Sequence, residues 1–333
     1  MSAFQLRMTV AALSLALFAQ TAFWLVYDIV ARGLPTAWSV WTSGDAPGLS
    51  ATSSLDLGLA ALQLAAGLAA LFETRAVGGL LLTACTVTLG FRLPVVWYFL
   101  LDSPSDPWFG ALTGPSVGVV GGTAVFAVLV TLVLGALLLW ARQQEQQASL
   151  RIDAVGGIRP VKVTATASGL LLAVLNIFYI GRNAVTAFDV GPGVLGDLIV
   201  GKGSGRAVLG VSSPYQWACL TVLCGAGMFL AARRRPTATG FSVGLSLFMM
   251  PSAFTDLCAY AAGGASQTLV DTSQNVLEFI GSAAVVALVA RDIRNDQRPK
   301  PAEDDGSGPG LGLESTEAAV PRPSVPTADV GEV

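Results

Sequence analysis

Long apolar runs separated by short polar segments fill the first 291 residues of the chain. A helix needs about 20 mostly apolar residues in a row to cross the hydrocarbon core of a membrane. Eight runs meet that length, at residues 8–31, 55–73, 76–101, 116–141, 163–182, 214–232, 239–262 and 273–291. The pattern predicts an all-α, polytopic membrane helix bundle with eight transmembrane helices.

The basic residues indicate how these helices are oriented. Lys and Arg gather at Arg75, in the central loop 142–162, at 233–235 and after residue 291. The loops 102–115 and 263–272, on the other side of the predicted membrane, contain neither residue. Cytoplasmic loops carry an excess of Lys and Arg, so both termini are predicted to be cytoplasmic in a multi-pass protein of the cell membrane. The first run is too long for a signal-peptide core and is interpreted as an uncleaved helix.

The runs also indicate an internal repeat. Each group of four begins with a helix and a long outer loop, at 32–54 and at 182–213. The third and seventh helices share a spacing of proline and aromatic residue, Pro94 to Trp97 and Pro251 to Phe254. Because four spans is an even number, both halves have the same orientation, which predicts two parallel four-helix repeats.

The predicted organisation has four parts. They are a first membrane repeat at 1–141, a cytoplasmic connecting loop at 142–162, a second membrane repeat at 163–291 and a cytoplasmic tail at 292–333. The tail is rich in Pro, Gly and acidic residues, which bury too little apolar surface to fold. It is therefore predicted to be disordered.

Two segments carry a resemblance to a known group. The first is Gln63-Leu-Ala-Ala-Gly-Leu-Ala-Ala-Leu-Phe-Glu-Thr-Arg-Ala-Val-Gly-Gly-Leu-Leu-Leu, where a helix ends in a Thr-Arg turn and restarts at a Gly pair. The second is Cys224-Gly-Ala-Gly-Met-Phe-Leu-Ala-Ala-Arg-Arg-Arg-Pro. With these features each half resembles the DoxX-like four-helix membrane proteins. The resemblance implies the architecture and gives no catalytic residues to transfer.

Composition excludes several kinds of chemistry. The chain is 53% hydrophobic and 12% charged and contains no histidine, the commonest general base and a usual metal ligand. Its four cysteines lie in apolar runs without a C-x-x-C spacing, and no Gly-rich phosphate loop or Asp-rich magnesium motif lies in the membrane region. The sequence therefore predicts no metal, no cofactor and no nucleic-acid partner.

Apart from Glu73 and Arg291 at the cytoplasmic ends of two runs, the charged residues within the runs fall in the outer half of the predicted membrane. They are Asp28, Asp56, Arg92, Arg182, Asp256 and Glu278. A charge at the centre of a membrane helix costs about 2.5–3.5 kcal/mol, so such residues face a cavity or a partner. Two interpretations stay open for the deepest ones. Arg92 and Asp256 form an ion pair that joins the halves, or Asp256, Glu278 and Asp28 face an internal cavity.

Aromatic residues show the same bias toward the outer half. They include Trp24, Tyr27, Trp97, Tyr98, Phe254 and Tyr260. An interfacial belt has two sides, whereas this excess has one. These aromatics, together with Arg92, are therefore predicted to bind a lipophilic substrate in a pocket at the outer leaflet.

Carboxylic acids in an apolar, aromatic-lined pocket suit one reaction class. Desolvation favours the neutral form of the acid, which then protonates an alkene or epoxide, and aromatic faces stabilise the carbocation. This chemistry is similar in kind to that of integral membrane terpene cyclases. The sequence thus predicts a metal-independent, protonation-initiated terpene or meroterpenoid cyclase, with Asp256, Glu278 or Asp28 as the proton donor.

Two other classes stay open. Repeats with polar residues beside a substrate route are typical of transporters, although the inner half shows no matching polar path. The DoxX resemblance allows a non-catalytic, quinone-associated membrane subunit.

Overall fold

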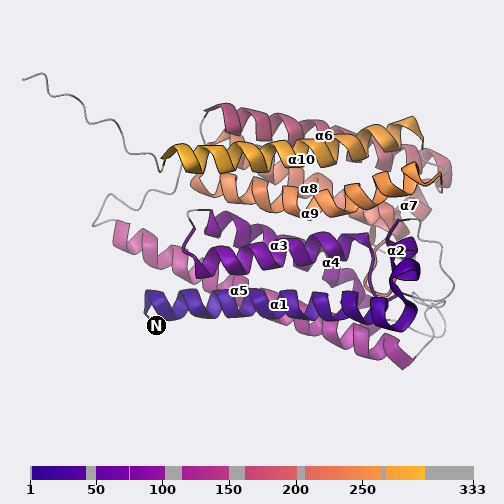
Figure 1. Cartoon of the computed structure of the whole chain (residues 1–333), viewed down its shortest axis with the longest axis horizontal. Coiled ribbons are helices and arrows are strands. Elements are labelled where there is room, and N and C mark those ends of the chain that lie inside the picture. The colour runs from indigo at the N-terminus through magenta and orange to yellow at the C-terminus, as the bar shows by residue number, and fades with distance from the viewer. Residues whose placement is uncertain are drawn as a thin grey trace, which may run out of the picture. The chain divides into compact units, whose positions relative to one another are not determined.

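The described part of the chain consists almost entirely of α-helices. The computed structural model describes residues 2–42, 50–74, 76–101, 115–149, 162–200, 207–263 and 268–296. Within these residues it contains (Figure 1) α1 (Ala3–Arg32), α2 (Leu34–Thr42), α3 (Ser54–Leu71), α4 (Val77–Leu101), α5 (Pro115–Ser149), α6 (Lys162–Val190), α7 (Pro192–Val200), α8 (Ser213–Ala232), α9 (Pro236–Ala261) and α10 (Leu269–Asp296). The predicted tail beyond residue 296 and most of the connecting loops lie outside the described residues.

Seven of these helices are long and apolar enough to cross a membrane. They are α1, α3, α4, α5, α6, α8 and α9. The predicted polytopic helical bundle agrees with this result. The predicted eighth span corresponds to α10, which is not among the seven and whose first turns carry Asp271, Gln274, Asn275 and Glu278.

Several helix bounds differ from the predicted runs. α5 continues to Ser149 and α6 to Val190, because the length of an apolar run marks the hydrocarbon crossing and does not mark where the helix ends. The two long loops predicted at 32–54 and 182–213 contain the short helices α2 and α7, which were not predicted. α7 follows Gly191 at φ 85°, a conformation that favours glycine, and starts at Pro192.

Helix α9 packs tightly between α3 and α4. Where it crosses α4, Gly240 and Gly79 bring the two backbones so close that neither position has room for a Cβ atom. At the crossing with α3, Gly58 lies directly against the carbonyl oxygen of Phe248. The hydroxyl of Thr83 adds a hydrogen bond to the Phe241 carbonyl, at 3.3 Å. Small residues allow close helix approach in membrane proteins, and here they fix the position of α9.

Helix α10 runs antiparallel to α6 along its length, as Figure 1 shows. Thr164 near the start of α6 contacts Asp292 near the end of α10, with an O–O distance of 2.5 Å. Leu171 packs against Gly281 midway, and Arg182 contacts Asp271 at the other end. The carboxyl-terminal part of α6 and the amino-terminal part of α10 therefore share one end of the bundle.

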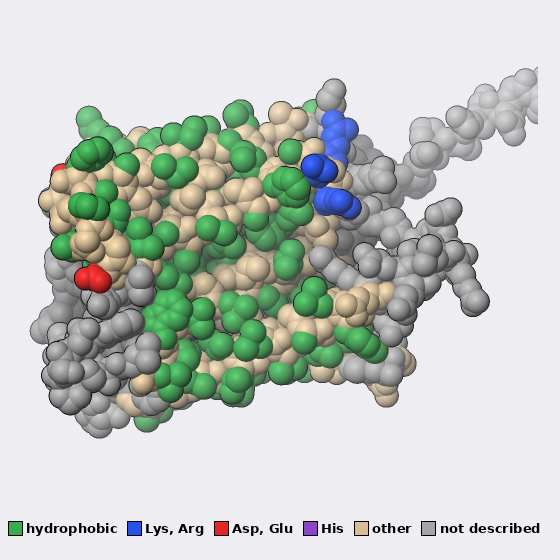
Figure 2. All heavy atoms as spheres, turned by 180° about the vertical axis from the view of Figure 1, so that it is seen from behind, with side chains coloured by type: hydrophobic (Ala, Val, Ile, Leu, Met, Phe, Trp, Pro, Cys, Tyr) green, Lys and Arg blue, Asp and Glu red, His purple; other side chains and the backbone are tan. Residues whose placement is uncertain are grey.

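The outer surface of the helices is apolar. Figure 2 shows hydrophobic side chains across the middle of the visible face and Lys or Arg side chains at one end. Exposed large side chains occur on many of the long helices, among them Phe23, Leu129, Leu170, Ile177 and Val222. A contiguous apolar exterior of this kind is what a helical bundle presents to lipid.

Candidate functional site

Two irregular segments meet at the end of the bundle where α2 and α7 lie. Ser50 and Ala207 form a parallel β-bridge between them. The Val208 amide donates to the Ser50 carbonyl at 2.9 Å, and the Leu209 amide donates to the Ala51 carbonyl at 3.0 Å. The bridge joins the loop before α3 to the loop before α8, which are far apart in the sequence.

Asp28 holds the first of these segments. Its side chain is 1% exposed and accepts hydrogen bonds from the Ser50 hydroxyl, the Ala51 amide and both the amide and the hydroxyl of Thr52, at 2.5 to 3.1 Å. Arg32, one turn along α1, lies 3.8 Å from the same carboxylate. A buried carboxylate with this many donors is satisfied as an anion, and its observed role is to shape the loop.

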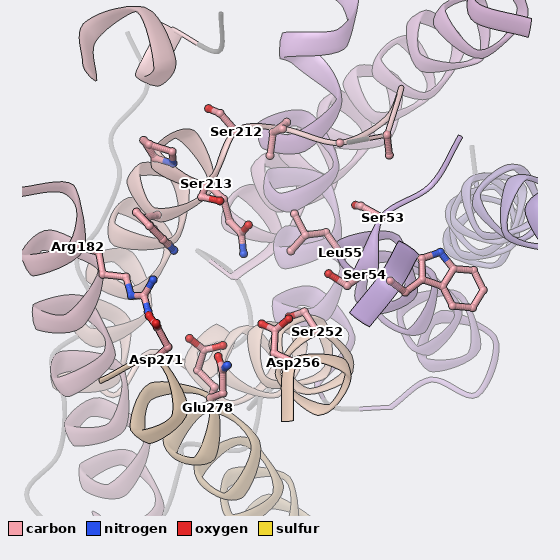
Figure 3. A pocket seen from close by; sticks show the side chains of 18 of the residues that line it. Ser53, Ser54, Leu55, Arg182, Ser212, Ser213, Ser252, Asp256, Asp271 and Glu278 are labelled. Atoms are coloured by element: carbon pink, nitrogen blue, oxygen red, sulfur yellow. The ribbon is translucent and has the colours of Figure 1, made fainter. Parts of the chain in front are cut away.

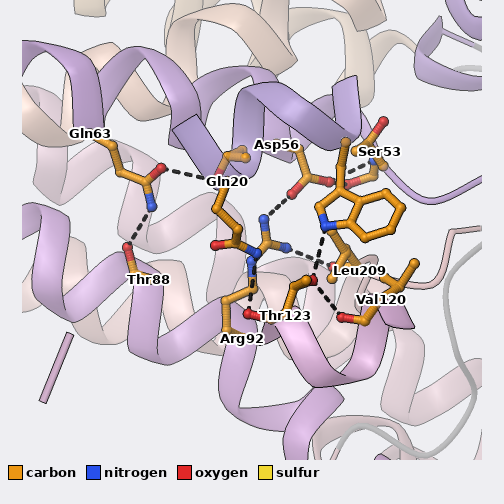
Figure 4. A network of polar contacts seen from close by, with 12 residues as sticks. Gln20, Ser53, Asp56, Gln63, Thr88, Arg92, Val120, Thr123 and Leu209 are labelled. Atoms are coloured by element: carbon orange, nitrogen blue, oxygen red, sulfur yellow. Dashed lines mark hydrogen bonds and ion pairs between the residues drawn. The ribbon is translucent and has the colours of Figure 1, made fainter. Parts of the chain in front are cut away.

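Arg92 and Asp56 form a buried ion pair, at 2.5 Å (Figure 4). Asp56 also accepts from the Ser53 amide at 2.7 Å, and Arg92 donates to the Leu209 carbonyl at 3.3 Å. Both side chains are at most 2% exposed. The structure corrects the expected pairing of Arg92 with Asp256, because the carboxylate that Arg92 contacts comes from α3. We call Asp28, Asp56 and Arg92 the closed cluster.

Further polar contacts extend from the closed cluster into the first helices. The Trp24 indole donates to the Thr123 hydroxyl at 2.9 Å, and Gln20 donates to the Thr123 carbonyl at 3.3 Å. Gln63 accepts from Thr21 and donates to Thr88. These bonds tie α1, α3, α4 and α5 together, so Trp24 has a packing role here.

A cavity of about 730 Å³ opens beside the closed cluster, between α2, α3, α6, α7, α8, α9 and α10 (Figure 3). Its lining is mostly polar. The hydroxyl, amide and charged side chains in it are Thr42, Ser53, Ser54, Arg182, Ser212, Ser213, Gln216, Ser252, Asp256, Asp271, Gln274, Asn275 and Glu278. Trp41 and Trp217 are its two aromatic residues. We call Asp256, Asp271 and Glu278 the cavity acids.

Glu278 is oriented by two donors. The Tyr179 hydroxyl donates to Glu278 Oε1 at 2.9 Å, and the Gln274 amide nitrogen donates to the same oxygen at 2.6 Å. Tyr179 is fully buried, so its position is fixed by packing. Both bonds occupy one carboxyl oxygen, and the second oxygen remains for a ligand in the cavity.

Asp256 reaches the cavity from α9. In Figure 3 its carboxyl group points into the same space as that of Glu278. Its charge interacts with those of Glu278 and Arg182. Ser252, one turn earlier on the same face of α9, also lines the cavity. The tight crossings of α9 with α3 and α4 therefore place Asp256.

Arg182 and Asp271 form an ion pair between α6 and α10 at the same end of the cavity. Each side chain is 23% exposed. The Arg182 guanidinium also lies over the Trp217 ring, 4.8 Å from its centroid. Such a cation–π contact stabilises a guanidinium by about 0.5–2 kcal/mol, depending on how far it is desolvated.

The structure places the predicted site residues in different surroundings. Asp256 and Glu278 line the cavity, whereas Asp28, Arg92 and Trp24 do not. Tyr27, Phe254 and Tyr260 are each more than 40% exposed and Trp97 is half-buried, and none of them is among the lining residues. The side chain of Tyr98 lies outside the described residues. Phe254 is two positions from Asp256 and so lies on the opposite face of α9.

The cavity includes polar residues that the sequence reasoning missed. On α10 they follow a helical spacing, at Asp271, Gln274, Asn275 and Glu278. Positions three, four and seven apart share one helix face, so this stripe was the signal available in the sequence. Among the described residues, no cluster of three or more His, Cys, Asp or Glu side chains is arranged to hold a metal ion.

Comparison with known proteins gives no relative for this chain: no protein family, no curated protein and no solved structure matches it.

Proposed function

We propose that this chain is a multi-pass membrane enzyme that protonates an isoprenoid-type substrate in the cavity and so initiates its cyclisation. Asp256 and Glu278 are the proposed proton donors. The observation that carries the proposal is that these two carboxyl groups, from different helices, point into one cavity large enough for a small organic molecule.

The proposed reaction is an isomerisation without any redox step. The carboxyl O–H transfers its proton to an alkene carbon, whose π electrons form the new C–H bond, or to an epoxide oxygen, whose C–O bond then breaks. A second alkene attacks the resulting carbocation and closes a ring. Loss of a proton from carbon to the carboxylate restores the acid, so product and substrate have the same mass.

The polar lining restricts the kind of substrate that can bind in the cavity. A wholly apolar molecule would displace water from the serine hydroxyls and amides without replacing their hydrogen bonds, which is unfavourable. We therefore expect the part of the substrate in the cavity to carry polar groups, as a prenylated molecule with a hydroxyl, carbonyl or epoxide does. Asp28 has a supporting role in this proposal, because it shapes the loop before α3 that contributes Ser53 to the cavity.

The finer membrane architecture is part of the same proposal: eight spans, two parallel repeats of four, and cytoplasmic termini in the cell membrane. The antiparallel path of α10 along α6 supports the eighth span. The order of one long helix, one short helix and three long helices, in α1–α5 and again in α6–α10, supports the repeat. Reporter fusions after Ser105 and Gly264 should report the outer compartment and a fusion after Gln147 the cytoplasm. A cytoplasmic signal at Ser105 would overturn this orientation.

The predominance of hydroxyl and amide groups in the lining favours a second candidate function, the binding or transport of a small polar solute. The two candidates differ in what happens to the ligand. An enzyme releases an isomer, whereas a carrier releases the molecule unchanged on the other side of the membrane.

The experiment that tests the enzyme uses membranes containing the full chain, incubated with prenylated hydroxybenzoates and their terminal epoxides. We expect a product of unchanged mass and new retention time with the natural chain and none with Asp256→Asn and Glu278→Gln together. Unchanged substrate in all samples, with accumulation inside sealed vesicles, would support the carrier and sink the enzyme.

A further inference from the structure

The cavity acids leave an excess of negative charge in the lining. Among the described lining residues, three carboxyl groups face the cavity against one guanidinium, and that guanidinium already contacts Asp271 and the Trp217 ring. Carboxyl groups that line one hollow attract a positive charge more strongly than a single carboxylate does on an open surface.

A second observation concerns the hydrogen-bonding capacity of the neutral residues. The hydroxyl of Ser212 donates to the Leu198 carbonyl at 2.7 Å, and that of Ser252 donates to the Met249 carbonyl at 2.9 Å. With their hydrogens engaged by the backbone, these two serines present oxygen lone pairs as acceptors to the cavity.

Gln274 supplies a third, independent indication. It lines the cavity and is 5% exposed, and its amide nitrogen must face Glu278 because a carboxylate oxygen accepts there. This orientation leaves Gln274 Oε1 buried without a hydrogen-bond partner among the described residues. A buried acceptor without a donor is unfavourable and is satisfied when a ligand supplies an N–H or O–H group.

We infer that the cavity binds an organic cation with N–H donors, a protonated amine, in preference to a neutral molecule of the same shape. The ammonium group forms when the amine takes a proton from the proposed acid, and its three N–H groups donate to Asp256, Glu278 and Gln274 Oε1. The inference rests on the proposed function in using the same cavity, and it holds whether the site performs chemistry on its ligand or only carries it.

The test compares two probes that differ only in the head group, farnesylamine and farnesol. Equilibrium binding of each radiolabelled probe is measured on the full chain in nanodiscs of zwitterionic lipid, with empty nanodiscs subtracted. We expect saturable binding of farnesylamine at least about tenfold tighter than that of farnesol, the factor for one or more charge-assisted hydrogen bonds. Equal affinity for the two probes would overturn the inference.

Variants locate the site. Asp256→Asn with Glu278→Gln should weaken farnesylamine binding by about tenfold or more, and by a clearly larger factor than farnesol binding. The matched control is Asp189→Asn, an exposed acid on α6 outside the lining, which should change neither. Undiminished farnesylamine binding in the double variant would contradict the assignment. If that variant does not accumulate, Ser213→Lys places a tethered ammonium in the cavity and should abolish farnesylamine binding, and retained binding would contradict the inference equally.

The outcomes separate this inference from the proposed function. Preferential amine binding without turnover of any prenylated substrate would support the cation site and contradict the enzyme proposal. Turnover with equal affinity for farnesylamine and farnesol would support the enzyme proposal and contradict the cation site.

Discussion

The closed cluster and the cavity acids lie at the same end of the bundle, the first fully buried and the second buried in part. Their surroundings differ. Asp28 and Asp56 accept hydrogen bonds from backbone amides, hydroxyls and Arg92. Glu278 receives both of its hydrogen bonds on one oxygen, and the cavity acids border open volume. The comparison teaches that a buried charge marks a functional group where part of its bonding capacity also faces open volume.

The following predictions test that contrast, in order of the expected change in the free energy of unfolding. The largest concerns Asp56→Ala, which leaves the Arg92 guanidinium buried without its carboxylate. We expect a loss of about 3–5 kcal/mol, measured by thermal or denaturant unfolding in detergent, or failure to accumulate. Asp56→Leu with Arg92→Met, which removes both charges, should recover most of the loss. A stable Asp56→Ala protein would show that the pair does not hold α3 against α4.

Asp28→Asn should have the next largest effect. The amide keeps one acceptor oxygen, but its NH₂ group faces donors at residues 50–52 that need an acceptor. We expect a loss of about 1–3 kcal/mol, the typical result of leaving buried donors unsatisfied. Asp189→Asn, an exposed acid on α6, serves as the control and should be neutral. Equal stability of Asp28→Asn and the natural chain would contradict the loop-shaping role.

Asp256→Asn should affect activity much more than stability, in contrast to the variants of the closed cluster. We expect a stability change within about 1 kcal/mol, because Asn keeps the volume of Asp and the side chain borders the cavity, and a fall in turnover of about 10²–10⁴, the usual contribution of a general acid. The measurements are the unfolding midpoint and the rate of isomer formation. Asp256→Glu should retain part of the activity. A fully active Asp256→Asn protein would remove Asp256 from the proposed reaction.

The smallest stability effect is expected for Asp271→Asn. Its pair with Arg182 is partly exposed on both sides, and such pairs contribute about 0.2–1 kcal/mol. Because the pair connects α6 to α10 beside the cavity, we expect a larger change in access. With the four native cysteines replaced by alanine and Ser252→Cys introduced, a membrane-impermeant thiol reagent should label the cavity several-fold faster in Asp271→Asn. Identical labelling rates would show that the pair does not restrict entry.

The sequence predicted the helical, multi-pass character well, because the apolar runs in a membrane protein are set by the thickness of the bilayer. It also identified Asp256 and Glu278 as candidate site residues. It could not distinguish Asp28 from Asp256, since both read as an acid near the outer end of an apolar helix. The difference arises from donors at residues 50–52, whose position depends on a loop that no local pattern specifies.

The ion-pair partner of Arg92 could not be predicted from the sequence for the same reason. Asp56 and Asp256 are far apart in the sequence. Only the way in which α9 crosses α3 and α4 decides which of the two faces the Arg92 guanidinium. The exposure of Phe254, in contrast, was available from helical periodicity, since residues two apart on a helix point in opposite directions. The aromatic pocket was predicted from depth alone, and depth carries no information about helix face.

The bridge between Ser50 and Ala207 has a consequence for biosynthesis. During synthesis α1 to α5 are made before residue 207. The contacts of Asp28 with residues 50–52 and the Asp56–Arg92 pair can therefore form first. Arg92 also donates to the Leu209 carbonyl, and Ser50 forms its β-bridge with Ala207. Both partners belong to the segment before α8, which is made later. Arg92 therefore lacks its carbonyl partner and Ser50 its bridge partner until the segment before α8 is made, and the cavity is complete only with α9 and α10.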